Sequence, residues 1–230
     1  MKLVLFDIDG TILVTRGAGR RALHRALLDV FGATGPDEYR FDGKTDPQIV
    51  RDLMRHVGHG DEYIDASMRD LLERYVRYLG EELADPSAEV HVFPGVCSLI
   101  DALDAHPDVL LGLLTGNLAD GARVKLAAAG IDPARFAVGA YGSDHEVRGE
   151  LPAIAVERAR ERFGRAIPGR DVVVIGDTPA DLQCGRGIGA RAIGVATGSY
   201  SLEQLAAHDP VAVFPDLADT EAVLRVILEE

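Results

Sequence analysis

A short apolar run near the start of the chain constrains the fold more than any other feature. Residues 2–6 (KLVLF) are almost continuously apolar, which is typical of a parallel strand buried on both faces. Asp7 and Asp9 follow the run, and Gly10 can then turn the chain away. Ligands of open α/β sheets bind beyond the carboxyl ends of the strands, where these two carboxylates are expected. A divalent cation between them would relieve their mutual repulsion, although solvated turn aspartates are the alternative.

The second half of the chain alternates between strand and helix patterns. Apolar runs predict strands at 109–114, 136–140, 172–175, 191–195 and 211–214. Helical patterns predict helices at 119–129, 151–163, 179–186 and 217–228. Strands that alternate with helices form parallel sheets with right-handed crossovers. We therefore predict an α/β protein whose core is a Rossmann-like, doubly wound parallel sheet.

Residues 16–88, in contrast, contain no strand pattern. Apolar residues recur there at helical spacing within 22–31, 49–57 and 62–83. Asp46 followed by Pro47 is expected as the N-cap and first turn of the second helix. The segment is therefore predicted to form an all-helical cap domain that is inserted after the first strand.

Glycine-containing links flank the helical segment. Residues 16–19 (RGAG) could act as one hinge, and Gly95 could act as a second one where the chain returns to the core. We expect residues 1–15 and 89–230 to form the α/β core domain and residues 16–88 to form the cap.

Composition narrows the classes of partner. The formal net charge of -13 and the isoelectric point near 4.9 argue against nucleic acid or an anionic membrane as a partner. An anionic substrate would then need local positive charge from a metal ion or from placed basic residues. Cys97 and Cys184 form neither a disulfide framework nor a zinc motif. No apolar run approaches the roughly 20 residues of a membrane span, and no signal peptide is evident, so we expect a cytoplasmic protein.

Further polar residues lie at the carboxyl ends of predicted strands or just before a predicted helix. They are Thr115, Gly116, Asn117, Arg148, Asp177 and Asp181. Each of these could instead be structural, as a helix cap, a first-turn partner or a solvated loop residue. Their order along the chain, however, would bring a hydroxyl, a cation and four carboxylates to one edge of the sheet.

This order of motifs resembles the haloacid dehalogenase superfamily, in its branch of phosphoglycolate-phosphatase-like hydrolases with a helical cap. The resemblance spans the whole chain. Residues 7–11 (DIDGT) stand where the family has its nucleophile loop, and Thr115 stands where it has its phosphate-binding hydroxyl. Residues 176–178 (GDT) with Asp181 match the acidic metal motif.

The resemblance implies a role for each acidic residue. Asp7 would be the nucleophile that forms an aspartyl-phosphate, and Asp9 would be the general acid and then the base. Magnesium would be held by the side chain of Asp7, the backbone carbonyl of Asp9 and the side chain of Asp177. Asp181 would lie further out and orient these ligands.

The basic and neutral residues are expected to hold the phosphate. Thr115 and the amides of Gly116 and Asn117 would bind phosphoryl oxygens. Arg148 is the best candidate for the cation for which the family usually has lysine, with a solvated loop arginine as the alternative. Lys44 lies in a predicted loop between cap helices and is either a contact for the anionic end of a substrate or simply exposed.

One further lysine, Lys125, falls within a predicted helix and is expected at the surface. Together, these features predict a magnesium-dependent phosphatase that hydrolyses a small phosphorylated metabolite, phosphoglycolate-like or a sugar phosphate. A sugar phosphomutase of the same fold and a non-catalytic, receiver-like phosphate-binding protein are the alternatives. Either a monomer or a homodimer is compatible with the sequence.

Overall fold

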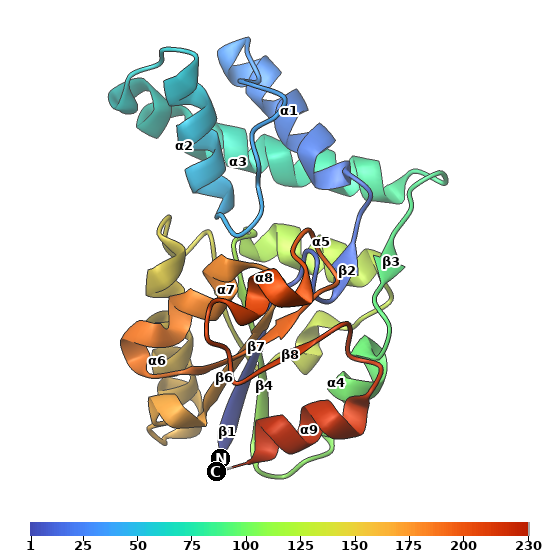
Figure 1. Ribbon diagram of the computed structural model, residues 1–230. Helices are drawn as coiled ribbons and strands as arrows, with labels where there is room; N and C mark the ends of the chain where they lie inside the picture. The colour runs from blue at the N-terminus through green and yellow to red at the C-terminus, as the bar shows by residue number, and fades with distance from the viewer. Residues whose placement is uncertain (230) are drawn as a thin grey trace.

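A six-stranded parallel sheet forms the centre of the computed structural model, which describes residues 1–229 (Figure 1). The strand order is β5-β4-β1-β6-β7-β8. The strands are β1 (Lys2–Phe6), β4 (Val109–Thr115), β5 (Val138–Tyr141), β6 (Val172–Gly176), β7 (Arg191–Val195) and β8 (Ala212–Phe214). Because β1 is central and pairs with both β4 and β6, its carboxyl end lies between the ends of these two strands.

Helices cover both faces of the sheet. They are α4 (Val96–Asp104), α5 (Ala119–Ala128), α6 (Leu151–Phe163), α7 (Pro179–Cys184), α8 (Leu202–Ala206) and α9 (Thr220–Leu228). Short 3₁₀ turns occupy Pro133–Arg135, Arg148–Glu150, Gly169–Asp171 and Gly185–Ile188. Alternate residues of β1 serve opposite faces: Val4 and Phe6 pack with α4, α5 and α9, whereas Leu3 and Leu5 pack with α6. Burial on both faces explains the continuous apolar run at 2–6.

Three helices form a separate group that lies beyond the end of the sheet, and we call them the helical module (Figure 1). They are α1 (Ala18–Phe31), α2 (Asp46–His56) and α3 (Asp61–Ala84). Their inward faces share an apolar cluster that includes Leu23, Leu53 and Leu71, and Leu118 just before α5 also joins it. The helical module therefore has its own small core, which contacts the α/β core near α5.

A two-stranded antiparallel ribbon joins the helical module to the core. It pairs β2 (Leu13–Val14) with β3 (His91–Val92). This ribbon is absent from the elements predicted from the sequence, because two-residue strands carry no usable periodicity. Gly95, which was expected as a hinge, follows β3 with φ +79°. A Cβ atom there would lie 1.9 Å from the carbonyl oxygen of Leu217, so only glycine fits this packed position.

The predicted fold class is confirmed, with small corrections to individual elements. The N-cap of α2 is Thr45 rather than Asp46, since the Thr45 hydroxyl accepts a hydrogen bond from the amide of Gln48. The helix predicted at 179–186 ends at Cys184 and continues as the 3₁₀ turn. Within the described residues, no helix has the length and apolar character that crossing a membrane requires.

Candidate active site

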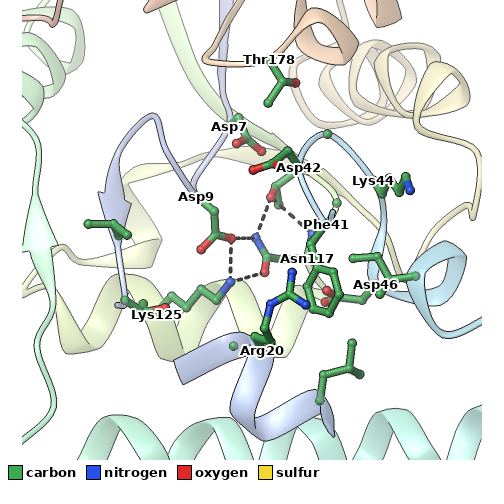
Figure 2. Close-up of a pocket in the computed structure, with 18 of the residues that line it drawn as sticks. Asp7, Asp9, Arg20, Phe41, Asp42, Lys44, Asp46, Asn117, Lys125 and Thr178 are labelled. Carbon is green, nitrogen blue, oxygen red and sulfur yellow. Dashed lines mark hydrogen bonds and ion pairs between the residues drawn. The ribbon is translucent and has the colours of Figure 1, made fainter. Parts of the chain in front are cut away.

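A pocket of about 210 Å³ lies between the carboxyl edge of the sheet and the helical module (Figure 2). The core contributes Asp7, Asp9, Thr115, Asn117, Lys125 and Arg148 to its lining. The helical module and its loop contribute Arg20, Phe41, Lys44 and Asp46. The strand ends and the module therefore enclose one polar site, and most of the residues singled out in the sequence lie in it.

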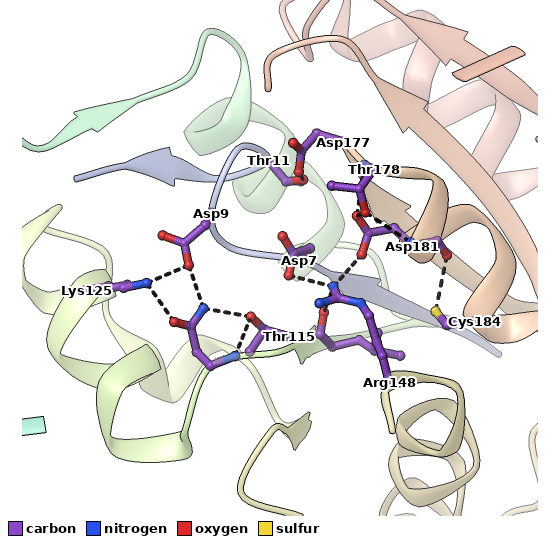
Figure 3. A network of polar contacts seen from close by, with 12 residues as sticks. Asp7, Asp9, Thr11, Thr115, Lys125, Arg148, Asp177, Thr178, Asp181 and Cys184 are labelled. Atoms are coloured by element: carbon purple, nitrogen blue, oxygen red, sulfur yellow. Dashed lines mark hydrogen bonds and ion pairs between the residues drawn. The ribbon is translucent and has the colours of Figure 1, made fainter. Parts of the chain in front are cut away.

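At one side of the pocket, three buried carboxylates lie close together, and a buried arginine binds two of them (Figure 3). Oxygen atoms of Asp7, Asp177 and Asp181 all lie within 4.8 Å of one another. Nη2 of Arg148 donates to Oδ1 of Asp7 at 2.8 Å and also to Oδ1 of Asp181. We call these four residues the carboxylate end. Arg148 is thus buried against the acidic group and is not a solvated loop residue.

Burial changes the protonation of the carboxylate end. Loss of solvent raises the pKa of Asp7 to about 7, against the opposing charge of Arg148. Burial and the neighbouring Asp181 and Asp7 also raise the pKa of Asp177 well above its usual range. One guanidinium cannot balance the charge of three carboxylates. The atoms of this group that could coordinate a metal ion are all carboxylate oxygens. This donor set suits a divalent cation such as magnesium.

Local hydrogen bonds fix the acidic side chains. Thr178 caps α7, and its hydroxyl donates to Oδ2 of Asp181 at 2.7 Å while its amide donates to the same oxygen at 3.0 Å. The hydroxyl of Thr11 donates to Oδ1 of Asp177 at 3.1 Å. Gly10 has φ +88°, and a Cβ atom there would lie 2.3 Å from Oδ2 of Asp177. The glycine after Asp9 therefore lets the first loop pack directly against the second acidic motif.

A second polar group lies on the other side of the pocket and consists of Asp9, Asn117 and Lys125, which we call the lysine end (Figure 3). Nζ of Lys125 lies 2.6 Å from Oδ2 of Asp9 and 2.6 Å from Oδ1 of Asn117. Nδ2 of Asn117 donates to Oδ2 of Asp9 at 2.7 Å and to the hydroxyl of Thr115 at 2.8 Å. The Asn117 side chain thus binds other residues of the site, and Thr115 is fully buried beside it.

The expectation of a surface position for Lys125 is wrong, because only 4% of this residue is exposed. It lies on the inward side of α5, three residues after the buried Ala122 and seven after the buried Leu118. Residues at these spacings share one face of a helix. The sequence therefore contained a signal for the position, which the charge of the lysine obscured.

The loop before α2 packs directly on the strand-end residues. The carbonyl oxygen of Gly116 accepts a hydrogen bond from the amide of Asp46 at 2.8 Å. A Cβ atom on Gly116 would lie 1.9 Å from the carbonyl oxygen of Lys44. The buried Asp46 also accepts from the amide of Leu118 at 2.9 Å, and burial raises its pKa to about 6. In the sequence, Asp46 was expected only as the start of a helix, so its place in the site was not predicted.

Two cations of the helical module line the outer part of the pocket. The ammonium of Lys44 lies 3.7 Å from the centre of the Tyr39 ring and 4.0 Å from a carboxylate oxygen of Asp52, and its side chain points away from Asp9 (Figure 2). The guanidinium of Arg20 stacks on Phe41 at 3.9 Å and was not singled out in the sequence. Both side chains are therefore already engaged by neighbouring aromatic residues.

Comparisons with known proteins agree with this geometry. The model of the haloacid dehalogenase-like hydrolase family matches residues 1–189. A phosphoglycolate phosphatase of Rhodospirillum rubrum is 28% identical over 220 residues, which cover 94% of this chain and 88% of that protein. A 5'-nucleotidase of Pseudomonas aeruginosa is 27% identical, with 98% of this chain and 95% of that protein covered.

Solved structures share the fold. A hydrolase from Pseudomonas syringae superimposes with a TM-score of 0.75 over the full length of both chains, at 21% sequence identity. The prediction of a hydrolase of the phosphoglycolate-phosphatase-like branch is confirmed by the family match and by the relatives. The chain described here, with its acidic strand-end site, belongs to the haloacid dehalogenase-like hydrolase family.

Proposed function

We propose that this protein is a magnesium-dependent phosphatase that hydrolyses a small phosphorylated metabolite through an aspartyl-phosphate on Asp7. The observation that carries the proposal is the carboxylate end, where three buried carboxylates lie together and two of them, Asp7 and Asp181, bind the one arginine. Such an excess of oxygen ligands is typical of sites that bind a divalent cation together with a phosphoryl group.

The proposed magnesium ligands are the side chains of Asp7 and Asp177 and the backbone carbonyl of Asp9. Asp181 would act from further out, since Thr178 and Arg148 already occupy both of its oxygens. Bound magnesium would neutralise charge on the phosphoryl group and on the carboxylates around it.

In the proposed reaction, Arg148 holds Oδ1 of Asp7, so Oδ2 is the oxygen that attacks phosphorus. The bond from phosphorus to the leaving oxygen breaks, and Asp9 gives that oxygen a proton. Asp9 then takes a proton from the water that attacks the aspartyl-phosphate, which restores Asp7 and releases phosphate. Thr115 and the amides of Gly116 and Asn117 are proposed to bind the phosphoryl oxygens.

We further propose that residues 16–88 act as a cap on a core formed by residues 1–15 and 89–230. The loop that carries Lys44 and Asp46 packs on Gly116, so movement of this segment would open or close the pocket. The pocket volume of about 210 Å³ lies below the roughly 300–1,000 Å³ of pockets for drug-sized ligands. This favours a compact substrate, phosphoglycolate-like or a sugar phosphate, and Lys44 is proposed to contact its distal anionic group.

The direct test is phosphate release from a panel of phosphorylated metabolites, with magnesium and with EDTA. The panel should include phosphoglycolate, sugar phosphates and nucleoside monophosphates, because relatives of the chain are named for phosphoglycolate and nucleotide hydrolysis. Turnover that needs magnesium and disappears in Asp7→Asn supports the proposal. Magnesium binding without phosphate release from any substrate would instead point to a mutase or a binding protein.

A further inference from the structure

The lysine end contains a buried cation that the proposed reaction does not use. Lys125 reaches the pocket from α5, and its side chain is 5% exposed, whereas the side chain of Asp9 that it binds is 43% exposed. The lysine therefore lies behind Asp9, and the carboxylate faces the pocket. A buried ammonium that binds a pocket carboxylate needs an explanation, because burial of a charge is costly unless it is paired.

The hydrogen bonds of Asp9 are one-sided. Lys125 and Asn117 both donate to Oδ2, at 2.6 Å and 2.7 Å. Within residues 1–229, no hydrogen bond to Oδ1 of Asp9 is present. The two donors bind each other as well, through Oδ1 of Asn117, so they form a closed triangle that fixes the plane of the carboxylate.

The helical module completes the enclosure of this triangle. A Cβ atom on Gly19, in the first turn of α1, would lie 3.6 Å from Nζ of Lys125 and 3.7 Å from the hydroxyl oxygen of Tyr75. Tyr75 is itself buried in α3 and lines the pocket. Lys125 is thus shielded from solvent by residues of the module, while Asp9 stays open to the pocket.

We propose that Lys125 is a positioning residue for proton transfer, which together with Asn117 clamps Oδ2 of Asp9 and presents Oδ1 to the leaving-group oxygen. The inference rests on the proposed phosphatase function and deepens it. The proton passes from Oδ1 of Asp9 to the leaving oxygen as the bond from that oxygen to phosphorus breaks. The negative charge that remains on Asp9 then faces the ammonium of Lys125 and the amide of Asn117.

The test compares two substrates whose leaving groups differ in their need for a proton. An alkyl phosphate leaves as a strongly basic alkoxide that requires protonation, whereas p-nitrophenyl phosphate leaves as a stable anion that does not. The measurement is kcat/KM, which reports the steps up to cleavage of the ester and excludes hydrolysis of the aspartyl-phosphate. The probes are p-nitrophenyl phosphate and the alkyl phosphate that the wild-type protein hydrolyses fastest.

For Lys125→Met, we expect kcat/KM to fall by about 30- to 100-fold with the alkyl phosphate and by less than about 3-fold with p-nitrophenyl phosphate. Lys125→Arg should recover most of the loss, because it restores a cation near Oδ2. Arg123→Met is the matched control, since Arg123 lies on the same helix, is exposed and pairs with Asp120. It should leave both values unchanged.

The ratio of the two kcat/KM values does not depend on the fraction of active protein, so partial unfolding cannot imitate the expected result. If Lys125→Met does not fold, Asn117→Ala removes the other donor and should show the same selective loss. Equal losses with both substrates, or no loss with either, would overturn the inference while the phosphatase function stands. A wild-type protein that hydrolyses neither ester would overturn the proposed function itself.

Discussion

The two ends of the pocket differ in charge balance and in burial. At the carboxylate end, Asp7, Asp177 and Asp181 outnumber their one cation, Arg148, and all four are buried. At the lysine end, Asp9 has a cation and an amide of its own, and it opens toward the pocket. The carboxylate end thus carries an excess of negative charge, whereas at the lysine end the carboxylate is balanced by its own cation.

This difference suits the two ends to different tasks. An incomplete group of buried carboxylates gains from a divalent cation and from the phosphoryl group that the cation brings. A carboxylate that has one oxygen held by hydrogen bonds can give or take a proton through its other oxygen and still keep its orientation. Under the proposed function, bond formation to phosphorus is assigned to the carboxylate end and proton transfer to the lysine end, and the variants below test this separation.

The largest effect is expected for Asp7→Asn at the carboxylate end. Removal of the proposed nucleophile should lower kcat/KM by at least about 10⁴-fold for every substrate, whatever its leaving group. Steady-state phosphate release with an alkyl and an aryl phosphate checks this, with the exposed Asp108→Asn as the control. A loss of kcat/KM confined to the alkyl phosphate would indicate that Asp7 acts in proton transfer. The two ends of the pocket would then not have different tasks.

The next largest effect concerns stability. Arg148→Met leaves buried carboxylates without their cation, so the free energy of unfolding should fall by about 3–5 kcal/mol in EDTA. Lys125→Met should cost only about 1–2 kcal/mol, because Asp9 can be solvated from the pocket.

Urea unfolding of both variants checks this contrast. Magnesium should recover part of the stability lost by Arg148→Met and little of that lost by Lys125→Met. Equal losses in the free energy of unfolding would show that the two ends do not differ in how much their cation stabilises the protein.

A smaller effect is expected from Asp46, which joins the helical module to the backbone of Gly116 and Leu118 on either side of Asn117. Its pKa is raised from 3.8 to about 6 in the folded protein, which corresponds to about 3 kcal/mol. A raised carboxyl pKa favours folding at low pH, and this contribution is lost as the pH rises from about 4 through 6. Asp46→Asn should therefore gain stability relative to wild type between pH 4 and pH 7. Urea unfolding of both proteins across this pH range measures the difference in their free energy of unfolding. A difference that does not change with pH would contradict the raised pKa of Asp46.

The smallest effect is expected for Lys44→Ala in the loop of the helical module. Because the ammonium of Lys44 is already held by Tyr39 and Asp52, its loss should raise KM only about 5-fold, with kcat unchanged. The rise should be confined to substrates with a second anionic group, such as phosphoglycolate. An unchanged KM for phosphoglycolate, or an equal rise in KM for substrates that lack a second anionic group, would show that Lys44 does not contact that group.

The carboxylate end could be predicted from the sequence because each of its residues follows or precedes a recognisable element. In a parallel sheet the strand order alone brings Asp7 and Asp177 together, and Arg148 arrives with the turn before α6. No side-chain geometry is needed for that inference. The same reasoning located Thr115, Gly116 and Asn117.

The lysine end could be predicted only in part. Lys125 lies on a helix, and its position depends on which face of that helix turns inward, which a charged residue obscures. The roles of Asp46 and Arg20 depend on how the helical module packs on the core, and local periodicity carries no such information. The ribbon of β2 and β3 is likewise a long-range pairing of very short segments. What the sequence did not reveal therefore lies at the contact between two parts of the chain.

The central claim is that Asp7 carries the phosphoryl group, and a trapping experiment tests it most directly. Asp9→Asn mixed with p-nitrophenyl phosphate and magnesium should still form the aspartyl-phosphate, since this leaving group needs no proton, but should hydrolyse it slowly. Rapid quenching and mass spectrometry should then find one added phosphoryl group, located on Asp7 by peptide mapping and absent from the Asp7→Asn, Asp9→Asn double variant. Release of phosphate by Asp9→Asn with no phosphorylated protein at any time, or with the phosphoryl group on another residue, would contradict the account.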